Sequence, residues 1–164
     1  MDINQTTERL GEVVKCAAAR FKDIGVTTSV EVAYMDSWMR TLDDPAKAKY
    51  VTVSLVLTAE GVTEGDEYCL SVGARVSRKR ISEQIIERDI AAFNSLVDEA
   101  YERISAKEDK SEAINELANE ASEDFDKLVT NIKTAEKKQR IYSIVGVVAI
   151  LAVFAIFLVV SLNV

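Results

Sequence analysis

The chain has 164 residues, a formal net charge of −7 and no histidine. The lack of histidine excludes the usual general base near neutral pH, nucleophile–histidine pairs and the commonest metal ligand. An acidic chain also argues against general nucleic-acid binding, which needs a basic surface, so nucleic acid is not an expected partner.

Residues near the N-terminus have the period of an amphipathic helix. Thr6 or Thr7 is expected to cap this helix, and Gly25 to end it. Its apolar side chains recur at steps of three and four and form one face: Leu10, Val13, Val14, Ala17, Ala18, Phe21 and Ile24.

The period then changes to two, which is typical of β-strands with one buried face. Three segments show it, at 29–35, 50–59 and 68–76. In the last two, one face carries Val51, Val53, Leu55, Leu57 and Ala59, and Tyr68, Leu70, Val72, Ala74 and Val76. Three such segments predict a small antiparallel sheet that helices cover on one side.

The two connecting turns contain the acidic side chains that a cation would need. Asp43 and Asp44 precede Pro45, while Glu64, Asp66 and Glu67 lie in the next turn. They would bind a divalent ion if the loops converged, but neither turn has EF-hand spacing, so solvated turns are expected.

An aromatic residue follows the first strand. Trp38, with Met35 and Met39, would form either an apolar contact patch or buried packing under the Pro45 loop, and we expect the buried packing because lone aromatics usually fill cores.

Helical spacing returns at about 82–104, with apolar residues at steps of four and three: Ile86, Ile90, Phe93, Val97, Ala100 and Ile104. The predicted fold is therefore α+β. An α-β-β-β-α head at 1–106 has a three-stranded antiparallel sheet packed by two helices, followed by a long charged helix and one C-terminal transmembrane helix.

The connector at 107–140 is expected to contain a third helix from about Glu108, with Ser105 and Glu108 spaced as a capping box. It would pack on the head, pair with another chain or run on into the anchor, and the sequence leaves these alternatives open. Its apolar residues form a heptad-like seam, here called the helix seam: Ile114, Ala118, Ala121, Phe125, Leu128, Ile132 and Ala135.

Residues 141–162 contain no charged side chain. As a helix, this segment spans about 33 Å, enough for the hydrocarbon core of a bilayer. The segment 141–164 is therefore predicted to be a membrane anchor, whose representative residues are Ile141, Tyr142, Gly146, Phe154, Phe157 and Leu162.

Basic residues crowd the N-terminal side of this anchor. The positive-inside rule places them, and the head with them, in the cytosol. The polar N-terminus does not read as a signal peptide, and two cysteines outside any CxxC motif fit a reducing compartment. The juxtamembrane basic residues are Lys133, Lys137, Lys138 and Arg140.

No catalytic constellation, phosphate-binding glycine loop or zinc-type cysteine spacing is present in the sequence. We therefore expect no enzyme activity and no cofactor. The expected role is a single-pass, tail-anchored interaction or self-assembly module. Its partners would be the lipid bilayer and a cytosolic protein or a second copy.

One resemblance gives an alternative. The α-β-β-β-α order, the first loop DDPAKAK and the run SRKR at 77–80 resemble a double-stranded-RNA-binding domain over residues 8–104. The family usually carries Gly-Pro and His in that loop, whereas this chain has Asp44-Pro45 and no His. The resemblance implies phosphate contacts from Arg75, Arg78, Lys79 and Arg80.

A second resemblance concerns layout only. A heptad helix followed by a C-terminal anchor resembles the arrangement of SNARE-type membrane-fusion proteins.

Overall fold

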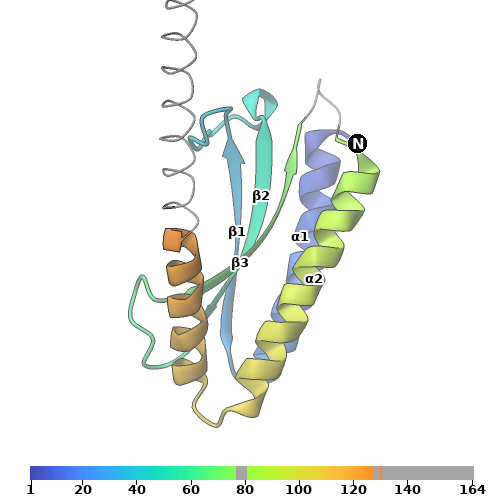
Figure 1. Cartoon of the computed structure of the whole chain (residues 1–164). Coiled ribbons are helices and arrows are strands. Elements are labelled where there is room, and N and C mark those ends of the chain that lie inside the picture. Colours follow the sequence, from blue (N-terminus) through green and yellow to red (C-terminus); the bar gives the residue numbers. More distant parts are fainter. Residues whose placement is uncertain (77–80, 128–129, 131–164) are drawn as a thin grey trace, which may run out of the picture. The chain divides into compact units, whose positions relative to one another are not determined.

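A computed structural model describes residues 1–76, 81–127 and 130. The chain folds as α1 (Ile3–Lys22), β1 (Thr27–Met35), a short 3-10 turn (Pro45–Lys47), β2 (Tyr50–Thr58), β3 (Tyr68–Arg75) and α2 (Glu83–Ala106). A third helix begins at residue 110 and is described through 127. The predicted α+β class and element order are confirmed (Figure 1).

The chain forms two compact units, Met1–Glu120 and a second that starts at Ala121. The first unit is called the head below. The boundary that the sequence suggested, at residue 106, falls inside this unit because the start of the third helix belongs to the head.

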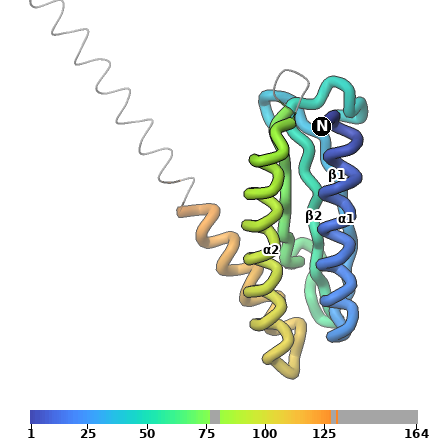
Figure 2. The backbone as a smooth tube through the Cα atoms, turned by 90° about the vertical axis from the view of Figure 1, so that its right-hand side faces the viewer, coloured from blue at the N-terminus to red at the C-terminus, as the bar shows by residue number. Residues whose placement is uncertain are grey.

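The sheet is an antiparallel meander with β2 in the centre. Val53 of β2 lies opposite Val32 of β1 and Val72 of β3, so these residues share one face. On this face, Val51, Val53, Leu55 and Leu57 are all fully buried. Helices α1 and α2 lie side by side over it (Figures 1 and 2). Each such side chain contributes about 1.5–3 kcal/mol by leaving water.

Helix α1 begins earlier than the sequence suggested. Asp2 is its N-cap and accepts a hydrogen bond from the Gln5 N–H at 2.9 Å, while the Gln5 side chain accepts from the Asp2 N–H. The capping role expected of Thr6 or Thr7 is therefore wrong. Both hydroxyls instead donate to carbonyls one turn back inside the helix. Gly25, at φ +83°, follows the end of the helix as predicted.

Helix α2 buries the whole predicted apolar set from Ile86 to Ile104. It is joined to α1 by an edge-to-face contact between Phe21 and Tyr101, with ring centroids 5.7 Å apart. The Arg20 guanidinium lies 4.8 Å from the Tyr101 ring centre and pairs with Asp98. The two helices therefore share an aromatic contact flanked by an ion pair.

The third helix starts at a different cap from the one expected. Asp109 accepts hydrogen bonds from the Ser111 N–H at 2.9 Å and the Glu112 N–H at 3.3 Å. The predicted Ser105–Glu108 capping box is wrong, because Ser105 lies in the last turn of α2 and donates to the Glu102 carbonyl.

The first turns of this helix complete the core of the head. Ala113, Ile114 and Leu117 are buried in the same apolar cluster as the sheet and α2. The sequence left open whether this helix packs on the head, pairs with another chain or runs on into the anchor. Residues 110–120 pack on the head.

This packing predicts a difference between two large apolar residues of the helix seam. Ile114→Ala should destabilise the head by about 2–4 kcal/mol, because it leaves a cavity in the core. Phe125→Ala, at a position 64% exposed, should change stability by less than about 0.5 kcal/mol. Denaturant unfolding of the full chain in detergent, followed by far-ultraviolet circular dichroism, measures both. Equal effects would show that the helix does not pack on the head.

Candidate functional site

Among the described residues, the most exposed large apolar side chain lies in the loop between β1 and β2. Trp38 is 81% exposed and Met39 beside it is 59% exposed. The expectation that Trp38 packs under the Pro45 loop is wrong. The loop has its own polar framework, which turns the indole outward.

That framework is centred on the Asp36 carboxylate. One of its oxygens accepts from the Trp38 N–H at 2.8 Å and from the Arg40 N–H at 3.0 Å. The other accepts from the Arg40 guanidinium, with Nε at 2.8 Å. Hydrogen bonds lower the pKa of the Asp36 carboxyl. The bond from the Arg40 backbone N–H has the largest effect, and those from the Arg40 side chain and the Trp38 N–H add to it. The carboxylate therefore holds both ends of the turn that presents Trp38.

The backbone inside this turn is strained. Met39 has φ +60°, in the left-handed region that costs an ordinary side chain about 1 kcal/mol. An isolated antiparallel β-bridge pairs Met35 with Thr41 just outside the turn. The turn therefore combines strained backbone with two adjacent exposed apolar side chains, which makes it a candidate contact site.

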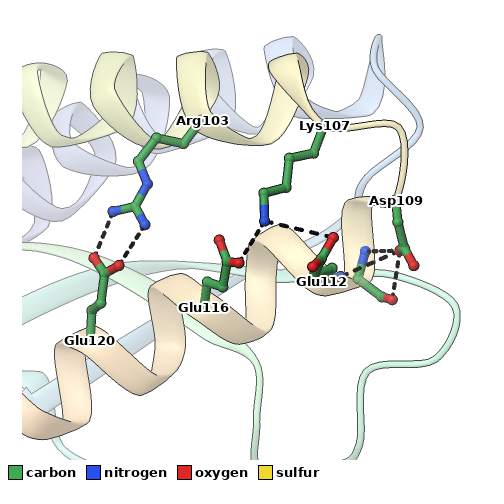
Figure 3. A network of polar contacts seen from close by, with 7 residues as sticks. Arg103, Lys107, Asp109, Glu112, Glu116 and Glu120 are labelled. Atoms are coloured by element: carbon green, nitrogen blue, oxygen red, sulfur yellow. Dashed lines mark hydrogen bonds and ion pairs between the residues drawn. The ribbon is translucent and has the colours of Figure 1, made fainter.

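A second polar cluster joins α2 to the third helix (Figure 3). The two terminal guanidinium nitrogens of Arg103 each donate to one carboxylate oxygen of Glu120, at 2.7 Å. Lys107 donates to Glu116 at 2.6 Å and lies 3.7 Å from Glu112. As the third helix advances from Glu112 to Glu120, its partners step back along α2 from Lys107 to Arg103, so the two helices run antiparallel. These three carboxylates and two cations are called the ion-pair ladder below.

Three members of the ladder, Arg103, Lys107 and Glu120, have pKa values shifted in the direction that favours the charged form. Hydrogen bonds from Arg103 lower the pKa of Glu120, and the same bonds raise the pKa of Arg103. The hydrogen bond to Glu116 raises the pKa of Lys107. Charged forms are therefore favoured on both helices.

Lys110 ties the connection between the two helices. Its ammonium donates to the carbonyls of Ile104 at 3.0 Å, Ser105 at 3.3 Å and Lys107 at 2.6 Å. These carbonyls lie at the end of α2, where the helix offers no partners of its own. The ion-pair ladder and Lys110 therefore have a structural role, since they connect the two helices. In the sequence they are visible only as alternating charges.

A shallow groove of about 400 Å³ lies between α1 and α2. Cys16, an exposed free thiol, lies on its wall. The other lining residues are Glu12, Val13, Ala17, Arg20, Asn94 and Val97.

The predicted seam is divided by the structure. Ile114 is buried in the head, whereas Ala121 and Phe125 are exposed in the second unit. Leu128 and Ile132 lie outside the described residues.

The residues predicted to contact phosphate are also divided. Arg75 is exposed, with its guanidinium 5.7 Å from the centre of the Tyr50 ring. Arg78, Lys79 and Arg80 lie outside the described residues.

The predicted anchor and its basic flank fall in the part of the chain that the structure does not describe. Within residues 1–76, 81–127 and 130, no helix is both long and apolar enough to span a bilayer. Outside these residues lie Lys133, Lys137, Lys138 and Arg140, and the anchor residues Ile141, Tyr142, Gly146, Phe154, Phe157 and Leu162.

The acidic turns do not converge. In an antiparallel meander, consecutive hairpin loops lie at opposite ends of the sheet, so Asp43 and Asp44 are separated from Glu64, Asp66 and Glu67 by the length of β2. Among the described residues, no group of three acidic or cysteine side chains is arranged to hold a metal. Asp44 instead caps the 3-10 turn by accepting from the Ala46 N–H at 3.0 Å.

Comparisons of the chain with protein-family models, with curated proteins and with solved structures found no match.

The Asp36 framework predicts the behaviour of the Trp38 turn. Asp36→Ala should lower the fluorescence anisotropy of Trp38 and speed tryptic cleavage after Arg40, while the melting temperature of the head stays nearly constant. The matched control is Asp43→Ala, which removes an exposed carboxylate from the same loop. Equal cleavage rates in the two variants would contradict the role of Asp36.

The ion-pair ladder predicts a dependence on pH. The pKa of Glu120 is lower in the folded than in the unfolded chain, so its stabilisation is present above about pH 4.5 and is lost as the pH falls through the folded value. Hydrogen exchange should therefore show that Glu120→Gln lowers the protection of amides 112–120 at pH 7, and that this loss is smaller at pH 3 because Glu120 binds protons as the pH falls. Glu123→Gln, on the same helix but outside the ladder, is the control. A Glu120→Gln effect that is the same at both pH values would contradict this account.

Proposed function

We propose that the protein is a single-pass, tail-anchored membrane protein with a non-catalytic cytosolic head, and that its copies self-assemble through the part of the helix seam that follows residue 120. The observation that carries this proposal is the exposure of Phe125. The side chain of this large aromatic residue is exposed, although the preceding turns of the same helix bury side chains in the core.

The spacing of the seam supports a contact with a second helix. Ile114, Ala121 and Leu128 are seven residues apart, and so are Ala118, Phe125 and Ile132. The head uses the first members of this pattern, since Ile114 is fully buried and Ala118 is half-buried. The exposed members Ala121 and Phe125 remain for a partner helix.

The membrane tether follows from the sequence alone. The 22 uncharged positions at 141–162 are long enough to span a bilayer, and the basic residues before them favour a cytosolic head. Tethering also confines copies to two dimensions and raises their effective concentration. A second copy of the same helix is therefore the partner that the arrangement favours.

Substitution of Phe125 tests self-assembly. In full-length protein reconstituted in lipid vesicles, Phe125→Ser should reduce cross-linked dimer by at least about tenfold, because burial of one phenyl ring contributes about 1.5–3 kcal/mol. Leu96→Ser is the matched control, since it removes a half-exposed apolar side chain from α2. A monomer in the unmodified protein, or equal losses in both variants, would overturn the proposal.

A further inference from the structure

The two ends of the sheet differ in charge. The loop between β2 and β3 carries Glu60, Glu64, Asp66 and Glu67, with no Lys or Arg from residue 59 to 67. The opposite end, where β1 ends and β2 begins, has three carboxylates, Asp36, Asp43 and Asp44, and four cations: Arg40, Lys47, Lys49 and Arg75. The two ends of the sheet therefore differ in charge, and the β2–β3 loop repels an anionic surface more strongly than the residues at the opposite end of the sheet.

Backbone hydrogen bonds show which residues share the less acidic end. The Lys49 N–H donates to the Met35 carbonyl at 2.7 Å, and the Val76 N–H donates to the Lys49 carbonyl at 2.8 Å. Lys49 and Arg75 are exposed here. The Trp38 turn follows directly on Met35, so the exposed indole lies at the same end as these cations.

The direction of the chain also favours this end as the one that reaches the membrane. Helix α2 starts near it and runs away from it, since Ile81 follows β3 closely. The ion-pair ladder makes residues 110–120 run antiparallel to α2, back toward the Trp38 end. Between Glu120 and the predicted anchor lie about 20 residues, which reach about 30 Å even at helical rise. The same length of α2 separates Arg103 from Glu83, so the connector is long enough for the Trp38 end to reach the bilayer.

We propose that the β1–β2 loop docks the head on an anionic membrane surface, with Trp38 and Met39 in the interfacial layer and Lys49 and Arg75 near lipid headgroups. This inference rests on the membrane anchor of the proposed function but not on self-assembly. Tryptophan favours the membrane interface because its ring is apolar and its N–H is polar. The framework of Asp36 already presents the ring, so docking requires little ordering of the loop.

Trp38 is the single tryptophan of the chain and reports on its own surroundings. The full-length protein is reconstituted in phosphatidylcholine vesicles with or without phosphatidylserine. With phosphatidylserine, Trp38 emission should shift to shorter wavelength and be quenched by lipids brominated near the headgroup. Lys49→Gln with Arg75→Gln should shift the docked equilibrium toward the undocked state by about fivefold for each charge removed.

A moved probe provides the control. Trp38→Phe combined with Leu96→Trp transfers the indole to a half-exposed position on α2, where brominated lipids should leave its emission unchanged. Equal quenching of both probes, or none of Trp38, would overturn the docking proposal.

Two further outcomes separate this inference from its alternatives. Protein that floats with vesicles but keeps a water-exposed Trp38 overturns docking and leaves the anchor intact. Protein that does not float removes the anchor itself and docking with it. Quenching of Trp38 by added double-stranded RNA, with brominated lipids ineffective, would identify the loop as an RNA contact instead.

Discussion

The fold depends on the burial of one face of β2. This central strand alternates fully buried Val and Leu with half-exposed residues, and β3 repeats the alternation in register, whereas β1 contains no fully buried residue. A sheet with one such face would leave its large apolar side chains in water, so the face is stabilised by helices that pack on it. Helices α1 and α2 meet this requirement, and the opposite face carries Ser54 and Ser71, whose hydroxyls bond to each other at 2.8 Å.

The third helix completes the apolar core beyond the sheet face that α1 and α2 cover. Ile104, near the end of α2, and Leu57, near the end of β2, are both fully buried. Ala113, Ile114 and Leu117 join the same cluster, while the ion-pair ladder sets the register of the helix on α2. Exposed ion pairs add little stability individually, so the apolar contacts hold the helix and the charges align it.

Periodicity predicted the elements well, because burial in a small sheet and in amphipathic helices repeats at fixed steps. All six apolar positions of α2 and the faces of β2 and β3 follow from it. It failed where one polar side chain decides the structure. Nothing in the period shows that Asp36 closes a turn that expels Trp38, although an Asp two residues before the Trp and four before an Arg is a recognisable signal. The start of the third helix was missed similarly, since Asp109 competes with Ser105 as a cap.

The ion-pair ladder also has a mechanical consequence. Its contacts are arranged in series along a helical hairpin: Glu120 with Arg103 comes first from the C-terminal side, then Glu116 and Glu112 with Lys107. Tension applied to the chain at Glu120 therefore loads one contact after another rather than all together. The hairpin opens by unzipping, which requires less force than shearing the same contacts in parallel, and its turn at Lys110 opens last.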